Sequence, residues 1–182
     1  MCVAILSKPN SIIPEPRLAQ GWKANSDGGG FAYVNEDNKV VIEKGFMEYE
    51  PFRDSYMKAA GRYAETSPML VHLRIRTSGN TSPANCHPFH IKDGAMIHNG
   101  IMFTPTGDRA GSAHDRKSDT RVFAEALYNI LKLEHVKNAA KELRSAIGYG
   151  NKLAFLYNNK EYFILGESDG YWLNDIWYSN IS

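Results

Sequence analysis

Cysteine is scarce in this chain of 182 residues, which contains only Cys2 and Cys86. A disulfide scaffold of the kind that stabilises small secreted domains is therefore excluded. Long apolar runs are missing as well. Near the N-terminus the longest one extends from Met1 to Leu6, too short for a membrane span or a signal-peptide core. These absences favour a cytoplasmic protein that does not act in a membrane.

Neither sign of charge dominates, because 21 Lys and Arg residues stand against 20 Asp and Glu residues, a formal net charge of +1. Such a balance gives no general attraction to nucleic acid or to an anionic membrane surface. Apolar residues make up 43% of the chain, enough for a sizeable core and too many for a disordered protein. At about 150 residues per domain, one domain over residues 1–182 is expected.

Short segments rich in Val, Ile, Phe and Tyr, bounded by turn residues, predict strands at residues 2–6, 30–35, 39–43, 69–76, 95–98, 152–157, 161–165 and 176–179. Helical periodicity predicts three helices: residues 51–64, a helix capped by Ser118 with apolar positions as far as Leu131, and residues 136–147. Strands and helices do not alternate strictly. The order therefore favours an α+β sandwich in which helices cover mostly antiparallel sheets.

Cys2 is the first residue that points to chemistry. If Met1 is removed, Cys2 carries both a thiol and a free α-amine. An α-amine pKa of about 7.7–8.0 lets this group accept the thiol proton at neutral pH. The alternative is a small apolar residue that opens a strand, so position alone leaves both interpretations open.

Residues 72–79, His-Leu-Arg-Ile-Arg-Thr-Ser-Gly, place charge at the end of a predicted strand. Residues two apart on a strand share a face, so Arg74 and Arg76 are predicted to point the same way. An inward-facing arginine followed by hydroxyl side chains can bind a carboxylate through a bidentate ion pair and hydroxyl donors. A surface strand with solvated arginines is the alternative.

An amide and a carboxylate come from two further segments. Asn99-Gly100 favours a turn in which the side-chain amide and the glycine N–H point at one spot, as in an oxyanion hole. An ordinary hairpin turn has the same sequence. Asp119 follows Ser118 at a helix start, where an aspartate can stabilise the helix without any functional role.

No metal or cofactor is expected. Four potential zinc ligands lie within thirteen residues but match no zinc-binding spacing: Cys86, His87, His90 and His98. The glycine triplet at residues 28–30 is not followed by a helical pattern and lacks the lysine of a phosphate-binding loop.

Taken together and in this order, these segments resemble one family, the glutaminase domain of class II glutamine amidotransferases, the N-terminal-nucleophile type. The resemblance covers nearly the whole chain, from Met1-Cys2 through DGGG at 27–30, HLRIRTSG at 72–79, NCHPF at 85–89, HNG at 98–100 and SDT at 118–120 to WYSN at 177–180. It implies the four-layer α/β/β/α sandwich of the N-terminal-nucleophile hydrolases. It also implies hydrolysis of glutamine to glutamate and ammonia.

Catalytic roles for three residues follow from the resemblance. Cys2 matches the N-terminal nucleophile, which forms a glutamyl thioester and releases ammonia. Asn99 matches the asparagine whose side chain forms the oxyanion hole together with the N–H of Gly100.

Three further residues match substrate-binding positions of the family. Arg74, with Thr77 beside it, matches the arginine that holds the α-carboxylate of glutamine, and Asp119 matches the aspartate that binds the α-amine. Free glutamine has one carboxylate, one ammonium and one reacting amide carbonyl, so the cation, the anion and the donor pair fit this substrate.

The chain departs from the family pattern in two places. Lys-Ala-Asn-Ser at residues 23–26 stands where several members carry Arg-Gly, so a helper arginine has no counterpart. Ile75 and Ser78 stand where the glucosamine-6-phosphate synthases usually have tryptophan and histidine. A distant branch of the family is therefore expected.

Three hypotheses about function remain. Because the sequence stops where the glutaminase domain should end, the first is a glutaminase that delivers ammonia to a separate acceptor enzyme. The second is an N-terminal-nucleophile amidohydrolase or acylase that acts on another amide. The third is a catalytically silent binding module of the same fold. In the first two, the active species is expected to begin at Cys2.

Overall fold

The computed structural model describes residues 2–102 and 116–180, whose strands form two antiparallel sheets. The larger sheet consists of β1 (Val3–Ser7), β2 (Gly29–Val34), β3 (Val40–Phe46), β4 (Met69–Leu73), β9 (Tyr171–Leu173) and β10 (Ile176–Tyr178), in the order β3-β2-β4-β1-β10-β9. The smaller sheet consists of β5 (Phe89–Ile91), β6 (Gly94–Asn99), β7 (Lys152–Tyr157) and β8 (Tyr162–Leu165), in that order.

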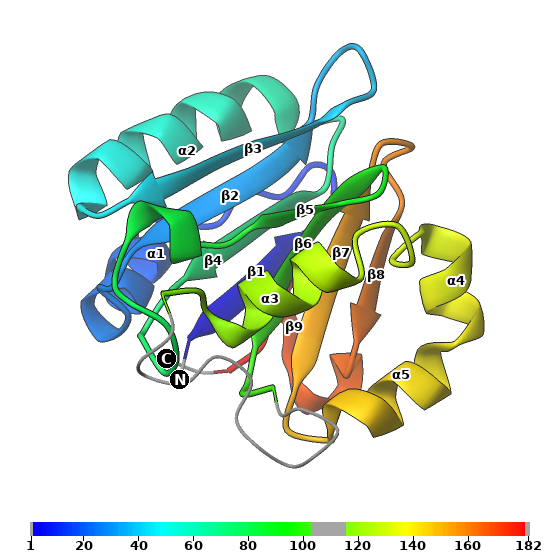
Figure 1. Cartoon of the computed structure of the whole chain (residues 1–182). Coiled ribbons are helices and arrows are strands. Elements are labelled where there is room, and N and C mark those ends of the chain that lie inside the picture. The colour runs from blue at the N-terminus through cyan, green and yellow to red at the C-terminus, as the bar shows by residue number, and fades with distance from the viewer. Residues whose placement is uncertain (1, 103–115, 181–182) are drawn as a thin grey trace.

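Helices cover the outer faces of the two sheets (Figure 1). The larger sheet packs against α1 (Glu15–Ala24) and α2 (Tyr49–Tyr63), and the smaller sheet against α3 (Asp119–Ala126), α4 (Leu133–Asn138) and α5 (Ala140–Ile147). Two short 3₁₀ turns, Pro83–Asn85 and Glu167–Asp169, lie between strands. None of the described helices is both long and apolar enough to cross a membrane.

Alternation along the strands explains this layering. In β1, Val3 and Ile5 pack in the core beneath α1 and α2, whereas Ala4 and Leu6 pack between the two sheets. Ile97 of β6 joins Ala4 and Leu6 from the opposite sheet. Because such strands are buried on both faces, their sequences are apolar at successive positions.

The arrangement is compatible with the α+β sandwich expected from the order of elements. Each of the eight predicted strands has a counterpart in the structure. Ser118 caps α3 as predicted, because its Oγ accepts the Arg121 N–H at 3.3 Å. The sequence therefore predicts most strands in their succession along the chain, even where the ends of elements differ.

One strand end and its consequence were predicted wrongly. β4 ends three residues before the predicted Arg76, and beyond it the Ile75 N–H donates to Cys2 Sγ at 3.4 Å instead of to a strand. The two arginines of this segment therefore do not share a face, since Arg74 is buried and Arg76 is exposed.

The helix predictions also need correction. The sequence analysis missed α1, in which only Leu18, Gly21 and Trp22 are buried. The helix predicted after Ser118 ends five residues before Leu131. The last predicted helix is two helices, α4 and α5, separated where Ala139 leaves helical geometry. β5 and β9 were missed because three residues are too few to show a periodicity.

Candidate active site

Five of the six site residues expected from the sequence line one small pocket: Cys2, Arg74, Thr77, Gly100 and Asp119. They come from four separate places, namely the start of β1, the segment after β4, the residue after β6 and the first turn of α3. The pocket is completed by six further residues that were not among the six expected site residues: Ile75, Ser78, His87, His98, Ser118 and Thr120.

Strand register places Cys2 beside the segment that follows β4. Val3 pairs with Leu73 in the antiparallel ladder, which brings the preceding residue, Cys2, next to Arg74. The Cys2 thiol donates to Ile75 O at 3.2 Å and accepts from Ile75 N at 3.4 Å. Burial raises the pKa of the Cys2 thiol, while the Ile75 backbone and the positive charge of Arg74 lower it in part. The thiol is therefore protonated at neutral pH, and a base must remove its proton before it can attack.

The Arg74 guanidinium is buried and holds the loop that follows it. Nη2 donates to Ser78 O at 2.8 Å, and Nη1 donates to Asn80 O at 3.2 Å. Gly79 between them has a φ of 66°, and a Cβ there would lie 2.7 Å from Ser118 N. Only glycine therefore allows this loop to approach the start of α3 so closely. A guanidinium has five N–H donors, so these two hydrogen bonds do not use all of them.

Asp119 is also buried, and both of its carboxylate oxygens have partners within the chain. Oδ1 accepts from Ser78 Oγ at 2.9 Å and from Thr120 N at 2.7 Å, and Oδ2 accepts from Met102 N at 2.8 Å. Ser78 thus contacts Arg74 through its carbonyl and Asp119 through its hydroxyl. The cation and the anion of the pocket are linked by one residue.

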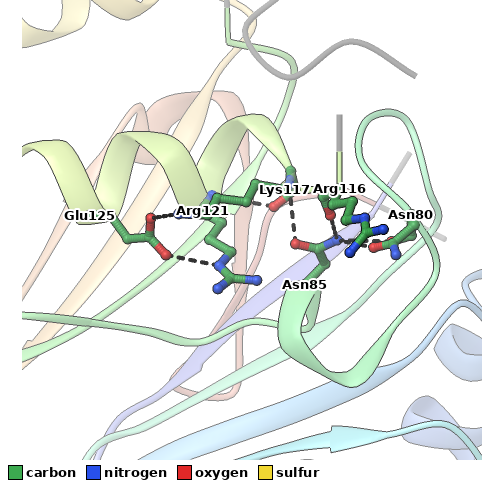
Figure 2. A network of polar contacts seen from close by, with 7 residues as sticks. Asn80, Asn85, Arg116, Lys117, Arg121 and Glu125 are labelled. Atoms are coloured by element: carbon green, nitrogen blue, oxygen red, sulfur yellow. Dashed lines mark hydrogen bonds and ion pairs between the residues drawn. The ribbon is translucent and has the colours of Figure 1, made fainter. Parts of the chain in front are cut away.

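Asn85 ties the same loop to the chain before α3 (Figure 2). Its Nδ2 donates to Asn80 Oδ1 and to Arg116 O, both at 2.7 Å, and its Oδ1 accepts from Ser118 N at 3.1 Å. The outer part of this network is a pair of exposed ion pairs to Glu125. The buried Asn85 amide therefore sets how the loop and the start of α3 lie relative to each other.

Asn99 is the sixth expected residue, and it lies at the end of β6 outside the lining of the pocket. Its Nδ2 donates to Ser179 Oγ at 2.7 Å, while its Oδ1 has no partner in the described part of the chain. Gly100 has a φ of 150°, and a Cβ there would collide with the Asn151 side chain. A glycine is therefore required directly after Asn99.

Three buried histidines lie at the pocket: His87 and His98 line it, and His72 stacks on His87. His98 donates from Nε2 to Asn151 Oδ1 and accepts the Thr120 hydroxyl at Nδ1, both at 2.7 Å. His72 Nε2 lies 2.9 Å from His98 O, and its ring stacks on that of His87 with centroids 3.8 Å apart. Burial lowers the pKa of all three, that of His72 to about 3, so the rings are neutral at neutral pH.

The described residues leave about 10 Å³ of open volume in the pocket, roughly what one water molecule needs. A ligand of amino-acid size therefore fits only after part of the lining moves. On the loop that follows β4, two residues line the pocket: Thr77 is exposed, whereas Ser78 is buried and contacts both Arg74 and Asp119.

Cys86 lies outside this pocket. It is a free, buried thiol whose Sγ is 3.7 Å from Ser82 O. Ser179, by contrast, contacts the expected site residue Asn99, and Asn151 contacts His98 of the pocket lining, but neither was identified from the sequence. Ser179 belongs to the closing WYSN motif, which was the only available signal.

No family model matches the chain. The curated protein "glutamine–fructose-6-phosphate aminotransferase [isomerizing]" from Bradyrhizobium diazoefficiens is 27% identical to it over 111 residues. The match covers 56% of this chain and 18% of that protein, so this chain corresponds to a small part of the relative's length. The relative contains a class II glutamine amidotransferase domain, which supports the resemblance seen in the motifs at the level of the family.

Proposed function

We propose that this chain hydrolyses glutamine to glutamate and ammonia as a class II glutamine amidotransferase domain of the N-terminal-nucleophile hydrolase fold. The similarity to a glutamine-using aminotransferase supports this proposal. The observation that carries it is the convergence of a thiol, a guanidinium and a carboxylate on one pocket, from Cys2, Arg74 and Asp119.

In the proposed reaction, the α-amine of Cys2 accepts the proton of its own thiol after Met1, which lies outside the described residues, has been removed. The sulfur then bonds to the side-chain carbonyl carbon of glutamine, and an electron pair moves onto the oxygen. When that pair returns, the C–N bond breaks and the nitrogen leaves as ammonia with the proton from the amine. Water hydrolyses the resulting thioester, which releases glutamate and restores the thiol.

Negative charge on the carbonyl oxygen is proposed to be stabilised by Asn99 and the N–H of Gly100. The two residues are adjacent at the end of β6, and Gly100 lines the same pocket as Cys2. Since this charge exists only during the reaction, the donors act mainly on kcat, and loss of one donor typically costs about 10²–10³-fold.

For binding, we assign the α-carboxylate of glutamine to Arg74, with Thr77 beside it, and the α-ammonium to Asp119. Ser78 contacts both charged groups through its carbonyl and its hydroxyl. The two charged ends of an amino acid would replace the carbonyl and the hydroxyl of Ser78, so each buried charge keeps a partner.

A second candidate is an amidohydrolase or acylase acting on a substrate that has no free α-amine. One observation favours it: both oxygens of Asp119 already accept hydrogen bonds from within the chain. In that case Asp119 would organise the loop and the start of α3 without contacting substrate.

Steady-state kinetics with glutamine separate the two candidates. Arg74→Ala and Asp119→Ala each remove a partner of a buried charge, a loss of about 2–5 kcal/mol by analogy with interfaces, so kcat/KM should fall by about 30-fold or more. Arg76→Ala is the matched control, because Arg76 is exposed and outside the pocket lining. It should leave kcat/KM unchanged. If Asp119→Ala retains full turnover of the best substrate, and that substrate lacks a free α-amine, the chain is an acylase and not a glutaminase.

We further propose that a separate acceptor enzyme receives the ammonia. Ammonia released into neutral water is protonated and diluted, so productive transfer needs an acceptor close to the pocket. Glutaminase activity that rises when the acceptor binds, and an acceptor that copurifies with this chain from its host, are the expected results. A glutaminase rate that no host fraction changes would favour a simple hydrolase.

A further inference from the structure

Ser179 is a buried residue that joins the two sheets at the end where Cys2 and Asn99 lie. It directly follows β10 of the larger sheet. Its Oγ accepts from Ala4 N at 2.9 Å and from Asn99 Nδ2 at 2.7 Å. Ala4 lies two residues after Cys2 on β1, and Asn99 ends β6 of the smaller sheet. One hydroxyl thus connects the strand of the proposed nucleophile to the proposed oxyanion amide.

The position of this hydroxyl is fixed by backbone and side-chain hydrogen bonds between residues 179–180 and the start of β1. Ser179 N donates to Ala4 O at 2.9 Å, which extends the pairing of β10 with β1. The next residue, Asn180, donates from Nδ2 to Cys2 O at 2.7 Å. The segment 179–180 therefore holds the backbone of Cys2 while it holds the amide of Asn99.

Strand alternation turns Cys2 and Asn99 toward the same space. Ala4 and Ile97 both pack between the two sheets. Cys2 precedes Ala4 by two residues and Asn99 follows Ile97 by two, so the two side chains share the inter-sheet side of their strands. An amide held at Asn99 therefore lies on the same side of the strands as the Cys2 thiol.

The hydroxyl of Ser179 accepts two hydrogen bonds but leaves the nearby Asn99 Oδ1 without a partner among the described residues. A hydroxyl has one proton and two lone pairs. Both lone pairs accept, from Ala4 N and from Asn99 Nδ2, while the buried Asn99 Oδ1 has no partner within the described residues. A buried amide oxygen without a partner costs free energy. A half-turn about the Cβ–Cγ bond of Asn99 brings Oδ1 to the hydroxyl and releases Nδ2.

We propose that Ser179 is the positioning residue of the oxyanion amide, an inference that rests on the proposed function. In the substrate complex the Ser179 hydroxyl donates to Asn99 Oδ1, and Asn99 Nδ2 donates to the oxygen of the reacting carbonyl. Because the hydroxyl holds the other end of the amide, Nδ2 stays aimed at the oxygen as charge develops. Ser179 therefore acts on the transition state and not on substrate binding.

Glutamine hydrolysis by the full chain without Met1 tests this inference in a double-mutant cycle. Ser179→Ala should lower kcat by about tenfold or more with little change in KM. In the Asn99→Ala background, Ser179→Ala should have no further effect on kcat, because the group it positions is already absent. A purely structural role would lower kcat in both backgrounds.

Ser7→Ala is the matched control. Ser7 is a buried serine on β1 whose hydroxyl has no partner among the described residues, at the strand end away from Cys2. Its removal should leave kcat and KM unchanged. Ser179→Thr keeps a hydroxyl and should recover most of the kcat lost in Ser179→Ala.

A measurement on the unmutated active site does not depend on the folding of the Ser179 variants. The Cys2 thiol adds to the carbonyl carbon of a glutamine analogue that has an aldehyde in place of the side-chain amide. The resulting hemithioacetal mimics the tetrahedral intermediate. The side-chain NH₂ signals of Asn99, identified by their loss in Asn99→Ala, should shift on addition of this analogue.

The outcomes separate the two levels of the proposal. Unshifted Asn99 signals, a wild-type kcat in Ser179→Ala, or equal losses in both backgrounds would overturn the role of Ser179 while the glutaminase assignment stands. A chain without Met1 that does not hydrolyse glutamine would overturn both.

Discussion

At the scale of single residues, burial and hydrogen bonding decide which side chains of the pocket carry a charge. Arg74 and Asp119 are 3% and 4% exposed, and each is bonded to neighbouring backbone or hydroxyl groups. His72 and His87 lie beside them but stay neutral, because burial lowers the pKa of both rings and Arg74 adds to that effect. Of Arg74, His72 and His87, Arg74 is therefore the positively charged side chain that could bind a substrate carboxylate.

Neutral buried histidines make the fold sensitive to acid. The unfolded chain takes up protons at histidine near pH 6.5, whereas the pKa of His72 in the folded chain is about 3. Below pH 6.5 the unfolded state therefore binds more protons, so stability is complete above that pH and declines as the pH falls toward 3. At pH 5.5 the loss from His72 is about 1.4 kcal/mol.

Proton uptake on unfolding measures this effect directly. At pH 5.5, His72→Gln should reduce the number of protons taken up on unfolding by about one relative to the wild type. Calorimetric unfolding of both proteins at several pH values, in buffers that differ in their heat of ionisation, measures the number of protons taken up. An unchanged proton uptake would mean that His72 is charged in the folded state.

Among helices and strands, most of the long or well-buried segments were predicted from the sequence, and the ones that were missed are short or have few buried residues. β1, β7 and the other strands buried on both faces were predicted because apolar residues occupy successive positions. α1 was not, since its exposed face is polar and it has few buried residues. The end of β4 was missed because it depends on Cys2, 73 residues away, whose sulfur bonds the Ile75 backbone. No local pattern could report that contact.

The loop between β4 and β5 supplies a test at this scale. Asn85→Ala removes the amide that joins Asn80, Arg116 and Ser118. We expect a loss of unfolding free energy of about 1–3 kcal/mol, because buried partners are left unpaired. KM for glutamine should also rise, because the loop then no longer fixes the position of the Arg74 side chain relative to that of Asp119.

Asn159→Ala is the control for this prediction. Asn159 is an exposed asparagine in the turn between β7 and β8, and it also makes side-chain hydrogen bonds. The Asn159→Ala variant should lose little free energy of unfolding and keep the wild-type KM for glutamine. Equal KM values in the Asn85 and Asn159 variants would show that the loop does not position the binding groups.

For the whole molecule, the two sheets bring together residues that are far apart in the sequence. The order of motifs was enough to select residues that converge on one pocket, from Cys2 to Asp119. The contacts of Ser78 with both charged groups, and of Ser179 with Asn99, could not be anticipated. They depend on how loops and sheet ends pack, which no single segment encodes. The catalytic and binding roles themselves stay predictions.

Cys2 is the nucleophile of the proposed reaction, and every other proposed role depends on it. The most direct measurement is peptide mass spectrometry of the chain without Met1 after reaction with a diazoketone analogue of glutamine. We predict one analogue per chain, attached to Cys2, with loss of glutamine hydrolysis in proportion to labelling. Cys86, buried outside the pocket lining, should stay unlabelled. Labelling at Cys86, or glutamine hydrolysis that survives in Cys2→Ala, would contradict the account.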